Sequence, residues 1–193
     1  CVGIIEAREV VAEFIEVGGG ECGTGDMNAD GTLNVLDVVT LVQAVLGGDA
    51  SDVDVCNGDV NSDGSLNVLD VVALVNQVLL GSGRVDGAAS VEFNVIGNEV
   101  TMTADGYVGG IQMTLSHGSG FALKLTDGGQ FSDYSTEGNT TTLIIVNPSN
   151  DNLFTTSGDF SIESVIATAN GNSYMDTKVV VPGDFTISAA YPN

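Results

Sequence analysis

The sequence predicts an α+β multi-domain chain, in which a small all-α module precedes an antiparallel β-sandwich or jelly roll. Two observations predict this arrangement. A loop-and-helix unit occurs twice between residues 21 and 86, and short alternating segments separated by turn residues fill residues 87–193. We therefore expect three parts: an N-terminal segment (1–20), a module built from the repeated loop and helix (21–86) and a sandwich domain (87–193).

The repeated unit carries the ligand spacing of an EF-hand-type loop. GDMNADGTLNVLDVVTLVQAVLGG begins at Gly25, GDVNSDGSLNVLDVVALVNQVLLG begins at Gly58, and 17 of their 24 aligned positions are identical. Oxygen-bearing residues recur at loop positions 1, 3, 5, 7, 9 and 12, which suits a hard cation such as calcium. One such loop could be an ordinary turn before a capped helix, but two complete copies favour two calcium ions. The expected ligands are Asp26, Asn28, Asp30, the Thr32 carbonyl, Asn34 and Asp37, then Asp59, Asn61, Asp63, the Ser65 carbonyl, Asn67 and Asp70.

A helix is expected after each loop, because apolar residues recur there at helical spacing and glycines follow them. The face predicted to be buried in the first helix consists of Val35, Val38, Val39, Val42, Val45 and Leu46, and residues 68–79 repeat it. Leu36 and Leu41 fall outside this arc, as do Leu69 and Leu74. A module of about 60 residues has little core for four further leucines. We therefore expect at least one pair to be covered by a β-sandwich of this chain or another, with a partner interface drawn from Val35, Leu36, Leu41, Val68, Leu69 and Leu74.

These features resemble type I dockerin domains over residues 21–83. The resemblance is carried by the doubled loop and helix and by Asp37 and Asp70, since aspartate fills the twelfth position in that family. It implies a protein-binding module whose partners are cohesin β-sandwiches. Hydroxyl pairs commonly precede the closing aspartate in the family, whereas Val35-Leu36 and Val68-Leu69 are apolar here. Such a surface could equally pack against another part of the same chain.

The second half of the chain has the texture of an all-β domain. Turn signals such as Gly97-Asn98 and Asp105-Gly106 separate the alternating segments. The expected strands are Ser90–Val95, Glu99–Ala104, Gly110–Ser116, Ala122–Thr126, Thr140–Val146, Gly158–Ala169 and Ser173–Val181. The stretch from Gly109 to Leu115 and the late strand are similar in layout to cohesins. The last five residues, AAYPN, are similar to the beginning of a type IX secretion sorting domain.

The N-terminal segment and the cysteines leave alternatives open. Residues 4–17 fit an amphipathic helix or a strand, either as the end of a preceding domain or as an element donated to a neighbour. Cys22 and Cys56 stand at similar distances before the two loops, which suggests a disulfide between them and an oxidising compartment. Three pairings are possible with Cys1, and the sequence does not fix the fate of the remaining thiol.

Charge and composition exclude several functions. With 26 acidic and four basic residues the net charge is −22, which argues against nucleic acid and anionic membranes as partners. No run of about 20 apolar residues predicts a membrane span. His117 has no recognisable acid or oxyanion hole beside it in the sequence, so we expect no enzyme.

We expect an extracellular or cell-surface structural protein that associates with other proteins, as a homo-oligomer or a head-to-tail fibre. The alternatives are a dockerin-type module that attaches a secreted enzyme to a cohesin scaffold, and a carbohydrate-binding tail.

Overall fold

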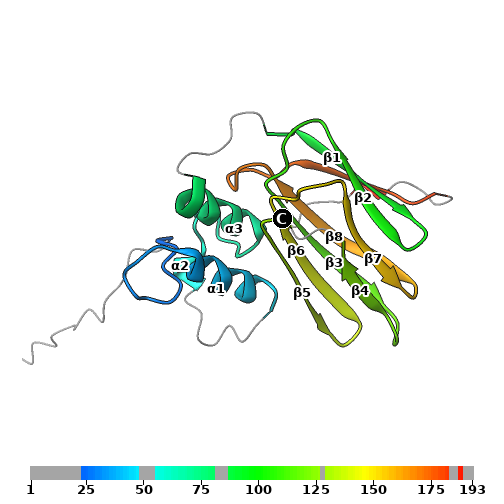
Figure 1. Ribbon diagram of the computed structural model, residues 1–193, viewed down its shortest axis with the longest axis horizontal. Helices are drawn as coiled ribbons and strands as arrows, with labels where there is room; N and C mark the ends of the chain where they lie inside the picture. Colours follow the sequence, from blue (N-terminus) through cyan, green and yellow to red (C-terminus); the bar gives the residue numbers. More distant parts are fainter. Residues whose placement is uncertain (1–22, 48–54, 81–86, 127–128, 183–186, 189–193) are drawn as a thin grey trace, which may run out of the picture.

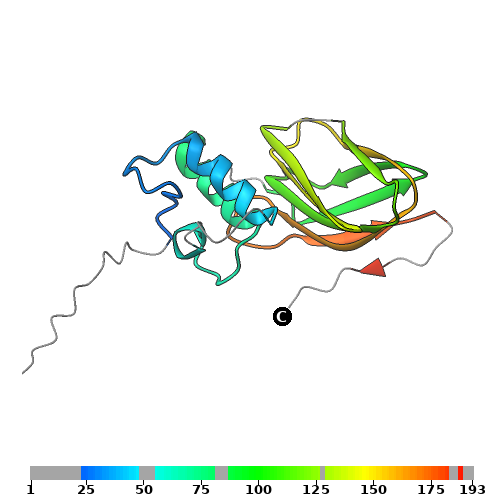
Figure 2. The same cartoon turned by 90° about the horizontal axis from the view of Figure 1, so that it is seen from below.

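The computed structural model describes residues 23–47, 55–80, 87–126, 129–182 and 187–188. Its helices lie together on one side of a β-sandwich (Figures 1 and 2). The expected order, a small helical region and then a sandwich, is confirmed. The prediction for residues 1–20 falls outside the described residues.

The two predicted helices are present, and each begins with the same local chemistry. They are α1 (Val35–Val45) and α3 (Val68–Val75), and a π-helical segment η2 (Asn76–Leu80) continues α3. Asn34 and Asn67, whose backbone is extended, cap the two helices with their side chains. The side chain of each closing aspartate accepts a hydrogen bond from the backbone amide of the capping asparagine, which completes a capping box. A four-residue helix, α2 (Val55–Gly58), was not predicted.

The sandwich consists of two sheets (Figure 1). The six-stranded sheet has the order β10-β9-β1-β2-β7-β4, and the four-stranded sheet has the order β5-β6-β3-β8. The strands are β1 (Ser90–Ile96), β2 (Glu99–Ala104), β3 (Gly110–His117), β4 (Ala122–Leu125), β5 (Phe131–Glu137), β6 (Thr140–Val146), β7 (Asn152–Ser157), β8 (Phe160–Thr168), β9 (Asp176–Val180) and β10 (Ile187–Ser188). The seven expected strands are all found with small changes at their ends, while β5, β7 and β10 were missed.

One strand pair corrects the expectation of a purely antiparallel sandwich. β1 pairs with β9 in parallel, with Ser90 opposite Asp176 and Phe93 opposite Val179. The other strand pairs among the described residues are antiparallel. The parallel pair joins strands that are far apart in the sequence, so no turn sequence between them could predict it.

β6 faces two hydrophobic cores at once. Leu143 and Ile145 lie in the core between the two sheets, where Phe93 and Phe154 are also fully buried. Because side chains alternate along a strand, Ile144 and Val146 point the other way and belong to the core formed by the helices. The helical module and the sandwich therefore share a buried apolar layer.

The face of α1 that is buried differs from the predicted one. Val35 and Val39 were expected in the core but are exposed, whereas Leu41 was expected outside it and is fully buried. The physical reason is that the neighbours of α1 lie toward the Val38, Leu41 and Ala44 side of the helix. The periodicity of a helix rich in apolar residues does not decide which side meets a neighbour.

Candidate functional site

Each acidic loop is closed by its own backbone amides. In the first loop the two carboxylate oxygens of Asp26 accept from the amides of Asp30 at 3.2 Å and Gly31 at 2.9 Å. In the second loop Asp59 accepts from Asp63 and Gly64, each at 3.0 Å. Gly31 and Gly64 adopt φ values of 80° and 84°, which favour glycine at this sharp turn. The two loops therefore have one geometry, as their sequence identity predicts.

The closing aspartates lie deepest in the site. Asp37 and Asp70 are fully buried. Asp37 Oδ1 accepts from the amides of Met27 at 3.0 Å and Asn28 at 3.3 Å, and Oδ2 accepts from Asn34 at 2.8 Å. These bonds orient both carboxylate oxygens and join the start of the loop to the first turn of the helix.

Electrostatics at the second loop favour a bound cation. Burial raises the pKa of the Asp70 carboxyl above its ordinary value, and the negative charges of Asp59 and Asp63 raise it further, against hydrogen bonds from the amides of Asn67 and Asn61 that lower it. A buried carboxylate beside two others is costly without a counter-charge. A divalent cation between them removes that cost.

The other ligand positions supply amide and carbonyl oxygens. Asn28 and Asp30 are joined by a 3.0 Å hydrogen bond, and the Thr32 carbonyl accepts from the Asn34 side chain at 2.9 Å. Within the described residues no three His, Cys, Asp or Glu side chains form a metal cluster. Each loop instead offers a mixture of carboxylate, amide and carbonyl oxygens, which is a ligand set that fits calcium. It offers none of the nitrogen and sulfur ligands that a zinc site uses.

The second repeat is docked on the sandwich. Val68, Leu69 and Val72 of α3 are at most 2% exposed, and they share a core with Ile144 and Val146 of β6. The amide of Val68 at the start of α3 donates to Gln112 Oε1 of β3 at 3.0 Å. Three further hydrogen bonds between described residues join the second repeat to the sandwich: Asn61 Nδ2 to the Gly171 carbonyl at 3.0 Å, Asn76 Nδ2 to the Asn170 carbonyl at 3.2 Å, and Asn67 Nδ2 to the Tyr174 hydroxyl at 3.4 Å. The first repeat adds an exposed bond from Gln43 Nε2 of α1 to Asp133 of β5 at 2.9 Å.

Glycines in the sandwich allow α3 to approach closely. A Cβ atom on Gly110 would lie 2.5 Å from Val72 Cγ2 and 2.9 Å from Val68 Cγ2. A Cβ atom on Gly171 would lie 2.5 Å from the Ala73 nitrogen and from the Leu69 oxygen. Only residues without a side chain fit at these two positions, so the surface of the sandwich is shaped for this helix.

The six predicted interface residues divide into three groups. Val68 and Leu69 lie at the contact with the sandwich, while Val35 and Leu36 are 44% and 58% exposed. Leu41 and Leu74 lie in the core of the module instead, because each packs against a glycine of the other repeat. A Cβ on Gly58 would come within 3.3 Å of Leu41 Cδ1, and one on Gly25 within 2.6 Å of Leu74 Cδ1. The expectation that the module had no room for them was wrong.

The sandwich side of this contact was not predicted. Gln112 was expected only as part of the strand Gly110–Ser116, and no role in binding was expected of Asn170 or Gly171. The pair Gly109-Gly110 at the start of the predicted strand Gly110–Ser116 was the available signal, since a glycine in a strand often marks the close approach of another backbone.

Cys56 takes part in a disulfide whose partner lies outside the described residues, so the predicted pairing with Cys22 stays a prediction. The Cys56 carbonyl accepts from the Gly23 amide at 2.7 Å. The other two cysteines, Cys1 and Cys22, lie outside the described residues.

His117 has a structural environment at the end of β3. Its ring stacks on Phe121 with the centroids 4.0 Å apart, and Nε2 lies 2.8 Å from the Thr141 hydroxyl. The Thr141 hydroxyl also lies 2.8 Å from that of Thr136. These contacts join β3, β5 and β6 and place no carboxylate on the imidazole.

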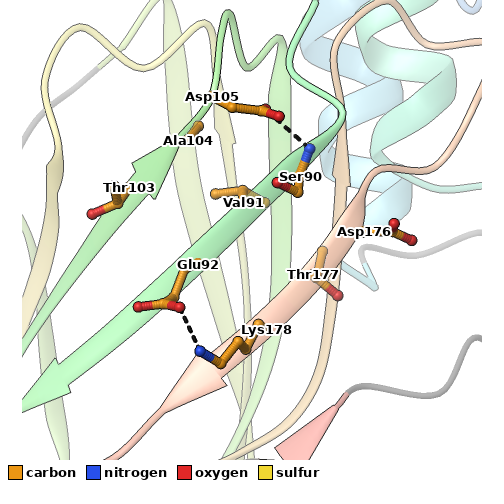
Figure 3. Close-up of a pocket in the computed structure, with 9 residues that line it drawn as sticks. All are labelled: Ser90, Val91, Glu92, Thr103, Ala104, Asp105, Asp176, Thr177 and Lys178. Carbon is orange, nitrogen blue, oxygen red and sulfur yellow. Dashed lines mark hydrogen bonds and ion pairs between the residues drawn. The ribbon is translucent and has the colours of Figure 1, made fainter.

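A surface depression of about 360 Å³ lies over β1, β2 and β9. Figure 3 shows the side chains that line it. In it Lys178 pairs with Glu92 at 2.6 Å, and the Asp105 carboxylate accepts from the amides of Ser90 and Ala89. These bonds, led by that from Ser90, lower the pKa of Asp105 below its ordinary value. The depression is lined by no aromatic side chain, which a sugar would use for stacking.

Comparison with known proteins agrees with the assignment of the module. The family model of the dockerin type I domain matches residues 24–79, and no curated protein matches the chain. Among solved structures, a non-cellulosomal cohesin from the hyperthermophilic archaeon Archaeoglobus fulgidus aligns at 16% identity and a TM-score of 0.33, covering 50% of this chain and 83% of that one. No helix in the described ranges is long and apolar enough to span a membrane. The predicted resemblance to dockerin type I domains is thus confirmed for residues 24–79.

Proposed function

We propose that this chain is an extracellular, calcium-stabilised assembly protein. Its helical module docks on the four-stranded sheet of a sandwich, either in the same chain or in the next one. Repeated from chain to chain, such docking builds a head-to-tail fibre.

One observation carries this proposal: α3 lies on the sheet through a dry apolar contact that ends in the hydrogen bond from Val68 to Gln112. Dockerin type I domains are modules for protein association, and a surface that binds within a chain can bind the same surface of a neighbour.

Two calcium ions stabilise the module in this account. The first is held by Asp26, Asn28, Asp30, Thr32, Asn34 and Asp37, and the second by Asp59, Asn61, Asp63, Ser65, Asn67 and Asp70. Support comes from the identical hydrogen bonds of the two loops and from the buried closing aspartates. Calcium would orient the first turn of each helix, and the residues that meet the sandwich begin there.

The disulfide of Cys56 supports an extracellular location for the protein, since structural disulfides persist in oxidising compartments. The acidity of the chain suits such surroundings, where calcium is abundant and salt screens repulsion between neighbouring copies.

Sedimentation and electron microscopy test the proposal. In calcium, the wild-type chain should grow in mass as its concentration rises and should form fibres. Leu69→Asp places a charge in the contact and should abolish fibre formation, whereas Ile96→Asp, at a residue 62% exposed on the sandwich, should not. A wild-type chain that stays monomeric at all concentrations, or a Leu69→Asp chain that forms normal fibres, would contradict head-to-tail docking.

A further inference from the structure

The start of α1 carries an apolar surface that nothing in the described structure covers. Leu33, Val35, Leu36 and Val39 are 37%, 44%, 58% and 45% exposed, and we call them the α1 face. Val35 and Val39 are one turn apart and Leu36 lies beside them. Single exposed leucines are common, but a contiguous apolar group of this kind marks an interaction site.

The second repeat shows that the same side chains can form a dry contact. The equivalents of the α1 face are Leu66, Val68, Leu69 and Val72. Val68, Leu69 and Val72 are at most 2% exposed beneath the sandwich, and Leu66 packs against the same core. Among the described residues, the difference between the repeats is therefore that a surface covers these side chains in the second repeat and none covers them in the first.

A sandwich of a second copy does not supply that surface. Its four-stranded sheet is covered by its own α3. The fit is also poor, because Thr40 stands where α3 has Ala73. The backbone of Gly171 approaches Ala73 so closely that even a methyl group on Gly171 would collide, and a threonine at that position would crowd the same backbone.

Charge favours another copy of the α1 face. The chain has a net charge of −22, so most surfaces of a second copy repel it. The only ionisable residue of α1 is Asp37, and it is fully buried. The helix itself therefore contributes no exposed charge to a contact between two α1 faces. We propose that the α1 face binds the α1 face of a second copy, related by a two-fold axis.

This contact is small, so the dimer should be weak and visible only at high concentration. Its test uses the full chain in calcium, examined by analytical ultracentrifugation. To suppress head-to-tail docking, every chain carries Leu69→Asp, so failure of that docking cannot be mistaken for failure of this proposal. The Leu69→Asp chain should form a dimer in a concentration-dependent way. Adding Leu36→Asp should weaken dimerisation at least about tenfold, whereas adding Ile96→Asp should leave it unchanged.

A mixing experiment identifies the partner surface. Chains with Leu36→Asp and chains with Leu36→Lys should each dimerise poorly alone and should form a mixed dimer together, because the two-fold axis brings the opposite charges close. Two results would overturn the proposal: a chain with Leu36→Asp that dimerises like its parent, or a mixture that forms no mixed dimer. Circular dichroism of each variant in calcium checks that the helices are retained.

Discussion

The backbone amide of Val68, at the first position of α3, donates to the side-chain oxygen of Gln112 on β3 at 3.0 Å. A helix leaves its first amides without partners inside the helix, and here a residue distant in the sequence accepts one of them. The bond fixes where α3 begins on the sheet.

Replacing Gln112 by alanine tests this bond. The Val68 amide would lose its acceptor at a buried contact, so the free energy of unfolding should fall by about 1–3 kcal/mol. Urea unfolding in calcium measures the change. Gln43→Ala is the matched control, because its bond to Asp133 is exposed and should contribute little. Equal losses in the free energy of unfolding of the two variants would show that the bond from Val68 to Gln112 contributes no more than an exposed hydrogen bond.

Gly110→Ala should loosen the docked helix. The added methyl group would collide with Val72 and Val68, so we expect a loss of about 1–3 kcal/mol. Gly118→Ala is the control, since nothing lies within 4 Å of the added atom there. Combining Gly110→Ala with Val72→Ala should recover part of the loss by making room. If Gly110→Ala and Gly118→Ala unfold alike, the helix does not pack on this strand.

Calorimetry should find two calcium sites of similar enthalpy in the wild-type chain. Asp70→Asn removes a charge from the second loop only and should weaken one site strongly, and Asp37→Asn should do the same for the other. Asp133→Asn, in β5 and outside both loops, should leave both sites intact. A single site in the wild-type chain, or none, would refute the ligand assignment.

Removal of calcium should unfold the helices and leave the sandwich folded. The core between the two sheets contains no residue of the module, so it has its own source of stability. Circular dichroism during titration with EDTA should show the loss of helical signal while the strand signal persists. Loss of both signals in one step would mean that the layer shared through Ile144 and Val146 makes one cooperative unit.

We predict that Cys56 pairs with Cys22. Peptide mapping without reduction should recover the two cysteines in one linked fragment. Cys22→Ala and Cys56→Ala should each lower stability by about 2–4 kcal/mol, while Cys1→Ala should have little effect. A linked fragment that contains Cys1 would rule this pairing out.

The parts of the site that depend only on residues close together in the sequence could be predicted from it. The alternation of Asp and Asn, the glycine turn and the closing aspartate all lie within twelve residues. The same holds for the Asn34 and Asn67 caps, which set the starts of both helices where the pattern predicted them. Such features repeat because each loop needs its own set.

The parts that depend on which other element of the fold a residue contacts could not be predicted. α1 and α3 have nearly the same sequence, yet Leu36 is exposed and Leu69 is buried, because Leu69 lies at the contact with the sheet and Leu36 does not. β5 was missed because its sequence, FSDYSTE, is largely polar and exposed along an edge. β7 begins directly after Asn150-Asp151, a dipeptide typical of turns, and for this reason the strand that follows it was missed.

The most direct measurement of the docking of the module on the sandwich uses a full chain with a protease site inserted between residues 83 and 84. After cleavage in calcium, the two fragments should elute together in size-exclusion chromatography, and EDTA should separate them. Cleaved chains that also carry Leu69→Asp should separate even in calcium, whereas those with Ile96→Asp should not. Fragments of the wild-type chain that separate at once in calcium, at concentrations in the micromolar range or above, would contradict the docking on which this account depends.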